Sequence, residues 1–253
     1  MKPKKKKKLK IILLSFLAVL ILLFGGFYVY TLDYYRASEH AAQTLAGLND
    51  QQVEMIGDRI IFYPNKALDS GSALIFYPGG KVEYTAYVPL MEQLAQKGLT
   101  CVLVKMPFNL AVFDINSADK VYAELPEIKN WYLAGHSLGG AMASSYAGKN
   151  SDKLDGLILL GAYPVNDSDI PTIAIYGSED INLDRTKLVN TANQVEIVGG
   201  NHAYFGDYGE QKGDGIATIS REEQQKQAVD AIMRFINDQS SGLLPVLYRR
   251  LLY

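Results

Sequence analysis

A serine enclosed by glycines is the residue of this chain best suited to covalent chemistry. Residues 135–139 read GHSLG, which is the pattern GxSxG, and a further glycine follows at position 140. Glycines at these positions leave room for a strained turn that lifts a serine hydroxyl above the end of a strand. Ser137 is therefore the candidate nucleophile for attack on a carbonyl carbon.

A serine hydroxyl is a poor nucleophile at neutral pH and needs a general base, a role that histidine fills most often. The chain has three histidines. His40 lies in a polar stretch with no partner near it in sequence, and the side chain of His136 should diverge from the neighbouring hydroxyl. His202 follows the last apolar run, in the glycine-rich loop GGNHAYFGDYG. His202 is therefore the candidate base.

An acid that orients the histidine is expected between these two residues, at the end of the preceding strand. The segment IAIYGSEDINLD offers three carboxylates, Glu179, Asp180 and Asp184. Asp180 is the candidate, because a short carboxylate on a tight turn is readily fixed toward an imidazole. Glu179 and Asp184 are interpreted as solvated loop residues.

Other chemistries find less support in the sequence. The segment GHSLGG contains neither GxGxxG nor GxxxxGK[ST], so a phosphate-binding turn is the less favoured interpretation. The single cysteine, Cys101, lies in the apolar run TCVLV and is interpreted as a small buried hydrophobe. No metal-ligand spacing or cofactor motif is present, and no cofactor or metal is expected.

The elements that must position these residues alternate between strand and helix. The segment 131–146 reads as strand, sharp turn and helix, and residues 53–63 resemble a β-hairpin with its turn at Gly57-Asp58. Further strands are predicted over residues 73–77, 99–105, 154–160, 171–176 and 194–198, and helices over 84–97, from about Ser117, and over 221–237. This order predicts an α/β fold, a doubly wound and mostly parallel sheet with helices on both faces.

Charge is distributed unevenly along the 253 residues. Seven of the 25 basic residues lie within the first ten positions, which leaves 18 basic against 27 acidic residues in the rest of the chain. An acidic domain is a poor partner for nucleic acid, so we expect no nucleic-acid interface.

An apolar run follows the lysine block and suits a membrane. Residues 11–30 are almost uninterruptedly apolar, and twenty residues at helical rise match a hydrocarbon core of roughly 30 Å. We interpret residues 11–30 as an uncleaved signal anchor, with the basic segment 1–10 in the cytoplasm and the large domain outside the cell. The alternative is a cleaved signal peptide and a secreted protein.

The rest of the chain divides into three predicted parts. Residues 31–50 read as a polar, weakly helical stem, and residues 51–238 as the α/β domain. Residues 239–253 form an apolar and basic C-terminal tail to which no function is given.

The GHSLG turn and the order Ser137, Asp180, His202 resemble the α/β-hydrolase superfamily over about residues 53–237. The segments YPGGKVEYTAY, LVKMPFNLA, AGHSLGG and GGNHAYFGDYG are similar to the alpha/beta hydrolase family 5, or dienelactone-hydrolase-like, group. The resemblance implies an α/β-hydrolase fold and catalysis by these three residues.

The resemblance also implies two backbone N–H donors for an oxyanion, those of Leu138 and Gly80, with Lys81 as second choice for the latter. The sequence differs from many members of this superfamily in two respects. Only residues 161–170 separate two predicted strands where many relatives insert a lid, so a minimal lid or none is expected, with an open site shaped by residues 107–116 and 204–215. The nucleophile is a serine and not the cysteine of dienelactone hydrolases, so their lactone substrate is not transferred.

The combined prediction is a membrane-anchored serine hydrolase, carboxylesterase-like (EC 3.1), which cleaves an ester-like bond of a small molecule. A carboxylic ester, a thioester or a lactone would each fit. Lys81 and Lys105 follow strand ends near the site, where they are either solvated or suited to a substrate carboxylate. Two alternatives remain: an amidase or acyltransferase with the same triad, and a non-catalytic binding module on the same scaffold.

Overall fold

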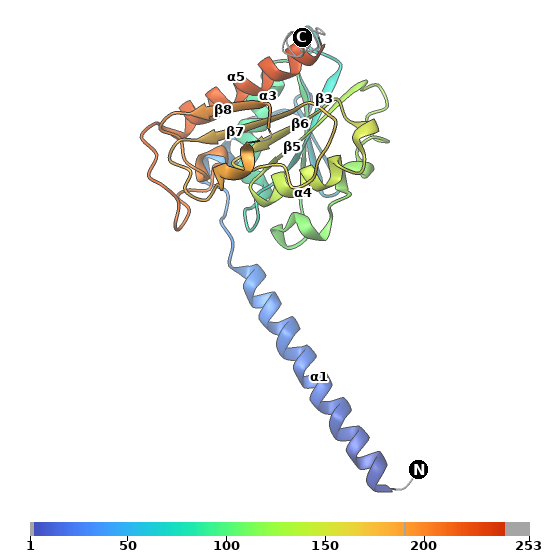
Figure 1. The fold of residues 1–253 in the computed structure, drawn as a ribbon. Coiled ribbons are helices and arrows are strands. Elements are labelled where there is room, and N and C mark those ends of the chain that lie inside the picture. Colours follow the sequence, from blue (N-terminus) through green and yellow to red (C-terminus); the bar gives the residue numbers. More distant parts are fainter. Residues whose placement is uncertain (1–2, 190, 241–253) are drawn as a thin grey trace, which may run out of the picture. The chain divides into compact units, whose positions relative to one another are not determined.

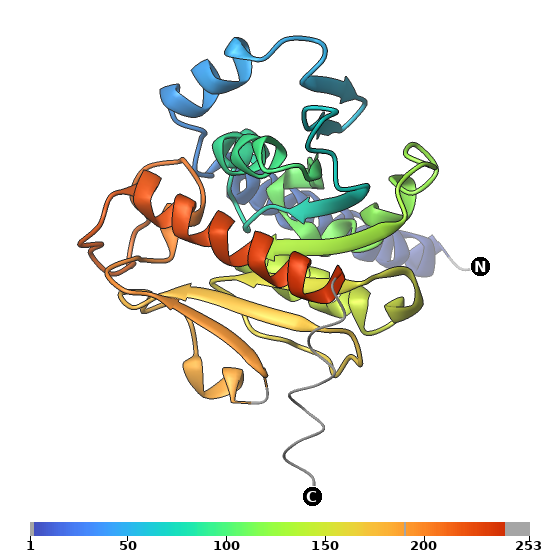
Figure 2. The same ribbon diagram turned by 90° about the horizontal axis from the view of Figure 1, so that it is seen from above.

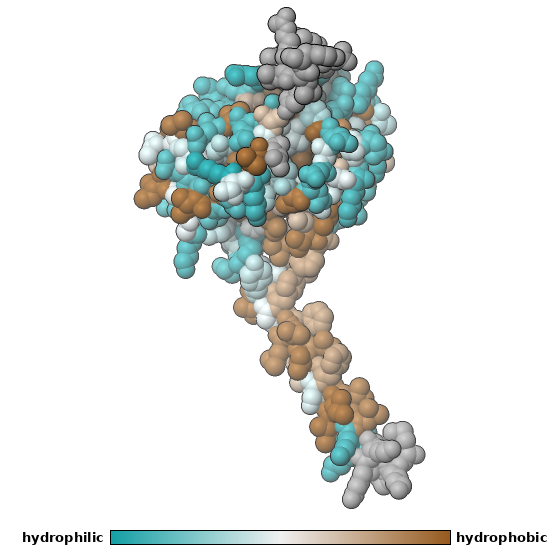
Figure 3. Space-filling view, in the orientation of Figure 1, coloured by the Kyte–Doolittle hydropathy of each residue, from teal (hydrophilic) through white to brown (hydrophobic). Residues whose placement is uncertain are grey.

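The computed structural model describes residues 3–189 and 191–240, which form two compact units divided after Tyr34. The first unit is helix α1 (Pro3–Leu32), drawn in blue in Figure 1. Its portion Lys7–Leu32 has a mean hydropathy of 2.7 and is long and apolar enough to cross a membrane. Figure 3 shows apolar side chains along this helix. The predicted span of residues 11–30 falls within it.

The second unit is built on a single eight-stranded sheet with the order β1-β2-β4-β3-β5-β6-β7-β8 (Figures 1 and 2). The strands are β1 (Val53–Ile56), β2 (Arg59–Phe62), β3 (Ser72–Tyr77), β4 (Thr100–Val104), β5 (Asn130–His136), β6 (Gly156–Leu160), β7 (Thr172–Gly177) and β8 (Asn193–Ile197). Strand β2 is antiparallel to both β1 and β4, and every other pair is parallel. The predicted mostly parallel sheet and the hairpin at 53–63 are confirmed.

Helices cover both faces of the sheet, as predicted. Helices α3 (Val88–Gln96) and α5 (Arg221–Ser240) pack on one face, and Figure 2 shows α5 in red lying across the sheet. Helix α4 (Leu138–Ala147) packs on the other face. All six residues of β3 are buried, because alternate side chains of a central strand enter the two opposite cores.

Short 3-10 turns complete the second unit. They are η1 (Tyr84–Tyr87), η2 (Pro107–Asn109), η3 (Ala111–Phe113), η4 (Ser117–Lys120), η5 (Ser151–Lys153), η6 (Arg185–Leu188) and η7 (Ala203–Phe205). The helix expected from Ser117 is therefore a single turn, since Pro126 follows closely and disfavours helical backbone at the residue before it. The helix expected over 84–97 is divided where Pro89 enters the first turn of α3.

The segment predicted as a stem belongs largely to the domain. The compact unit begins at Tyr35 and not at residue 51. Helix α2 (Glu39–Gly47) follows the N-cap residue Ser38 and buries Ala41 completely, while Leu45 packs against the core beside α3. Apolar residues at helical spacing give this short, largely polar helix one face that packs on the domain.

Only the first two residues of the predicted C-terminal tail, 239–253, are among the described residues. Residues 239 and 240 continue α5, and residues 241–253 of the predicted tail lie outside the described residues.

Candidate active site

The turn that carries Ser137 joins β5 directly to α4. Strand β5 ends at His136 and the helix begins at Leu138, so the serine alone makes the connection. Its backbone has φ 52° and ψ −121°, which a non-glycine residue adopts only under strain. The Ser137 N–H donates to the Leu160 carbonyl at 2.9 Å, which ties the turn to the end of β6. The predicted strand, sharp turn and helix are all present.

Crowding of the backbone explains the glycines around the serine. A Cβ on Gly135 would lie 2.5 Å from the carbonyl carbon of Gly139. A Cβ on Gly139 would lie 2.2 Å from the Tyr77 carbonyl oxygen, and one on Gly140 would lie 2.6 Å from Cβ of Ala162. All three distances are too short for real atoms, so side chains at these positions would force the turn open.

Asp180 and His202 contact each other, and His202 lies against His136, the residue before Ser137. The His202 Nδ1 lies 2.8 Å from Asp180 Oδ2, and both residues are buried. The other carboxylate oxygen of Asp180 accepts from the N–H groups of Asn182 and Leu183 at 3.0 and 3.1 Å. An acidic partner at Nδ1 places the imidazole proton there, which leaves Nε2 free to act as a base.

The two other carboxylates of this loop have different partners. Glu179 accepts from the Ser178 hydroxyl, while Asp184 caps η6 and accepts from the N–H and hydroxyl of Thr186. The Thr186 hydroxyl lowers the pKa of Asp184. Neither has a hydrogen bond to His202 among the residues that the structure describes.

Gly161 packs against His202 and Asp180, and sequence reasoning did not identify it. It follows β6 with φ 52°, and a Cβ there would lie 2.9 Å from His202 Nδ1 and 3.1 Å from Asp180 Oδ2. A glycine placed directly after the strand run LDGLILL was the available signal, because carboxyl ends of parallel strands gather at one edge of the sheet.

His136 has a structural role that its sequence position did not indicate. Its buried ring is hydrogen bonded at both nitrogens, Nδ1 to the Tyr87 hydroxyl at 2.8 Å and Nε2 to the His202 carbonyl at 3.0 Å. The rings of His136 and His202 are 4.6 Å apart between centroids. Burial, and secondarily the neighbouring His202, hold the pKa of His136 well below its usual value, so this imidazole is neutral.

Hydrogen bonds connect Gly79, the residue before the predicted oxyanion donor Gly80, to the predicted base His202. The Gly79 N–H donates to the Tyr87 hydroxyl at 3.0 Å, and that hydroxyl donates to His136 Nδ1. The His136 Nε2–H then donates to the carbonyl of His202. Burial raises the pKa of Tyr87, which keeps its hydroxyl proton available for this chain. Sequence reasoning did not find Tyr87, because only the fold brings the turn η1 to His136 at this edge.

The two predicted oxyanion donors lie side by side. Leu138 is the first residue of α4, so its N–H has no partner within the helix. A Cβ on Gly80 would lie 2.8 Å from Cδ2 of Leu138, which shows that the Gly80 backbone passes close to the Leu138 side chain. Within residues 3–189 and 191–240 the Gly80 N–H has no hydrogen-bond acceptor. The alternative donor, the Lys81 N–H, already donates to the Asn109 carbonyl at 2.8 Å.

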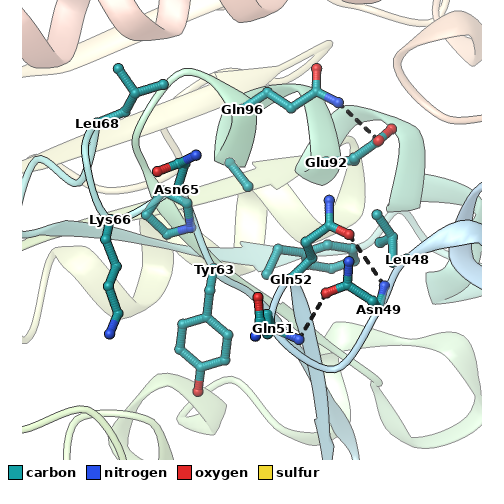
Figure 4. Close-up of a pocket in the computed structure, with 13 residues that line it drawn as sticks. Leu48, Asn49, Gln51, Gln52, Tyr63, Asn65, Lys66, Leu68, Glu92 and Gln96 are labelled. Atoms are coloured by element: carbon teal, nitrogen blue, oxygen red, sulfur yellow. Dashed lines mark hydrogen bonds between the residues drawn. The ribbon is translucent and has the colours of Figure 1, made fainter.

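Three cavities of the surface lie away from the predicted catalytic residues. One cavity has a volume of about 900 Å³. Amide side chains such as Asn49, Gln52 and Gln96 line it (Figure 4). Two others, of about 920 and 520 Å³, border β6 and β7 and the β8–α5 side, and none of the three includes a predicted catalytic residue. Residues 161–171, which join β6 to β7, contain no helix or strand.

The described residues contain no cluster of three or more His, Cys, Asp or Glu side chains suited to a metal ion. Cys101 is fully buried, and burial raises the pKa of its thiol far above the usual value.

A family model described as "Alpha/beta hydrolase family" matches residues 73–226, a stretch that contains the serine turn, Asp180 and His202. The chain belongs to this family. No curated protein matches this alpha/beta hydrolase. The resemblance noted from the GHSLG turn and the ordered residues is thereby confirmed at the level of the family.

Solved structures share the fold of this alpha/beta hydrolase. Est1E from Butyrivibrio proteoclasticus is 15% identical with a TM-score of 0.51, over 73% of this chain and 98% of its own. A dienelactone hydrolase from Anabaena variabilis is 18% identical with a TM-score of 0.51, over 72% and 98%. A serine hydrolase without a lid from Xanthomonas campestris is 12% identical with a TM-score of 0.52, over 74% and 97%. Identities this low show the common fold alone.

Proposed function

We propose that this alpha/beta hydrolase is a serine hydrolase that cleaves an ester-like bond of a small molecule. The observation that carries the proposal is the 2.8 Å contact between Asp180 and His202 beside the strained turn of Ser137. A buried acid, a histidine with one free nitrogen and a serine on a glycine-lined turn are the parts of a nucleophilic triad. Carboxylic ester, thioester and lactone all present the carbonyl carbon that this triad attacks.

The reaction follows from the roles of these groups. His202 Nε2 takes the proton of Ser137 as its oxygen bonds to the carbonyl carbon, and Asp180 stabilises the imidazolium. The N–H groups of Leu138 and Gly80 stabilise the oxyanion. His202 then protonates the departing oxygen or sulfur, which leaves an acyl-serine. Water, deprotonated by His202, attacks the acyl-serine and releases the acid and the free serine.

We also propose that residues 11–30 anchor the enzyme in the cell membrane with the hydrolase unit outside. The length and hydropathy of helix α1 and the lysines that precede it support this topology. Protease added to intact cells should release a soluble fragment of the hydrolase size. A fragment fully protected in cells with an accessible surface would contradict the topology, and a mature chain that begins after residue 30 would indicate cleavage and secretion instead.

The catalytic proposal is tested with p-nitrophenyl esters of increasing acyl length and the Ser137→Ala variant. We expect turnover by the native enzyme and a loss to the background rate in the variant, with a nearly unchanged melting temperature. Labelling of Ser137 by a fluorophosphonate probe extends the test to unknown substrates, because it requires only an activated serine. Folded protein that neither turns over an ester nor accepts the probe would refute the proposal and favour a binding role.

A further inference from the structure

The chain enters the second unit beside the predicted oxyanion donors. Tyr35, its first residue, donates its N–H to the Lys81 carbonyl at 2.8 Å and accepts from the Glu83 N–H at 2.8 Å. Lys81 directly follows Gly80, so the entry point lies on the edge of the sheet that carries the candidate site. In the sequence only two residues separate Tyr35 from Leu32, the last residue of the apolar helix. A link of this length spans about 11 Å at most.

Apolar side chains lie on the surface at the same edge. Phe108, Val112 and Phe113 are 52%, 43% and 51% exposed, and the two phenylalanine rings meet edge to face at 5.6 Å. The loop that carries them is hydrogen bonded to the residue after the predicted oxyanion donor Gly80, because the Asn109 carbonyl accepts from the Lys81 N–H. Ile181, which is 70% exposed, follows Asp180 directly. We call these four side chains the apolar rim.

The backbone beneath the rim is strained. Phe108, Asn109 and Lys81 all have positive φ, at 56°, 55° and 59°. A bulky aromatic residue in this region is an outlier. Burial of Phe108 does not compensate the strain, because about half of the residue stays exposed. Strain maintained beside a catalytic site points to a functional constraint on the position of the loop.

We propose that the apolar rim enters the surface of a lipid bilayer and that the substrate is an ester dissolved in that bilayer. The inference rests on the proposed function. A bilayer is the favoured occupant because an anchor in residues 11–30 keeps the membrane one short link away from Tyr35. Exposed Lys105 follows β4 directly, before the loop that carries Phe108 and Phe113, and its Nζ lies 5.9 Å from the ring centroid of Tyr84. Cationic and aromatic residues together are typical of membrane interfaces.

The test uses a fragment that begins at Asp33, without the apolar helix. The three hydrophobic clusters of the domain draw their described residues from positions 35–236 only, so the fragment retains its whole core. Flotation with vesicles of phosphatidylglycerol and phosphatidylcholine in equal parts measures binding. Turnover is compared between a dissolved short-chain p-nitrophenyl ester and a long-chain p-nitrophenyl ester held in the same vesicles.

The rim variant is Phe108→Ser with Phe113→Ser. Its matched control is Met55→Ser with Leu68→Ser, which removes two side chains exposed to similar extents, 62% and 58%, away from the candidate site. We expect the rim variant to lose vesicle binding and to lower the ratio of vesicle-held to dissolved turnover about tenfold or more, because membrane binding scales with the apolar area inserted. The control should retain both values.

Equal binding and an equal ratio in the native fragment, the rim variant and the control would overturn the inference. A native dimer that the rim variant abolishes in the absence of vesicles would also overturn it, because a second copy would then be the occupant. Failure of the proposed function is separate: no dissolved ester would be cleaved by any form, while flotation would still decide the role of the rim.

Discussion

Gly161 offers a test of the geometry around the candidate base that needs no change to any of the three proposed catalytic residues. Alanine there would place its Cβ 2.9 Å from His202 Nδ1 and 3.1 Å from Asp180 Oδ2. Non-bonded heavy atoms prefer separations of about 3.5 Å or more. The imidazole must therefore move by roughly half an ångström, away from a position that its hydrogen bond with Asp180 and its ring contact with His136 now hold.

The Gly161→Ala substitution has two effects of different size. The positive φ of 52° costs an alanine about 1 kcal/mol of the free energy of unfolding. Displacement of the base acts on the rate, and a misplacement of 1 Å costs about a hundredfold. Half that displacement corresponds to a loss of roughly tenfold in kcat/KM, or about 1.4 kcal/mol of transition-state stabilisation.

Gly57→Ala is the matched control. Gly57 has φ 57° in the turn between β1 and β2, and a Cβ there meets nothing within 4 Å, so the control has the same backbone strain without the contact. Urea unfolding and kcat/KM on a dissolved ester are measured for both variants. Both should lose about 1 kcal/mol of stability. Only Gly161→Ala should lose activity, and equal kcat/KM values in the two variants would refute the assigned contact.

Three further predictions concern the same hydrogen-bonded groups. Asp180→Asn should lower kcat by about 10³- to 10⁴-fold in steady-state ester hydrolysis, because an amide no longer selects the Nδ1–H tautomer of His202; a loss below tenfold would exclude the orienting role. Tyr87→Phe leaves the Gly79 N–H and His136 Nδ1 without their partner and should cost about 1 to 3 kcal/mol in urea unfolding, whereas an unchanged midpoint would contradict it. Burial lowers the pKa of His136, so below about pH 6.5 the unfolded chain binds more protons than the folded chain. The free energy of unfolding should therefore fall with decreasing pH, by up to about 1.4 kcal/mol per pH unit. This slope should be shallower in His136→Gln than in the native protein, and equal slopes would show that His136 does not contribute.

Much of the candidate site was accessible to sequence reasoning because it depends on local patterns. The Ser137 turn needs small residues within a few positions of the serine, and strand and helix periodicity flank it directly. His202 and Asp180 were found from their order and from their places after strand ends, since parallel strands deliver such positions to one edge. The eight-stranded sheet and its two covered faces follow from the same alternation of elements.

The tertiary structure decided what depends on contacts between distant parts of the chain. In the sequence His40 has no partner near it, yet its Nδ1 lies 2.6 Å from Oδ2 of Asp207. Asp207 also forms an ion pair with Arg221. The Asp207 carbonyl in turn accepts from the Ser38 N–H at 2.8 Å, which holds the start of α2 on the domain. No pattern within the predicted stem could reveal a partner about 170 residues away, because periodicity reports only which face is buried and not what covers it.

The same reason separates the recognised site residues from the missed ones. Ser137, Asp180 and His202 carry chemistry in their side chains, so residue type and chain order sufficed to select them. Gly161 and Tyr87 matter through the space that they leave empty or the hydrogen bonds that they relay, and these exist only once β6 is paired with β5 and η1 brings the Tyr87 hydroxyl to His136. The sequence alone thus determined the fold class and the candidate reacting groups, while the packing of distant elements determined how those groups are held.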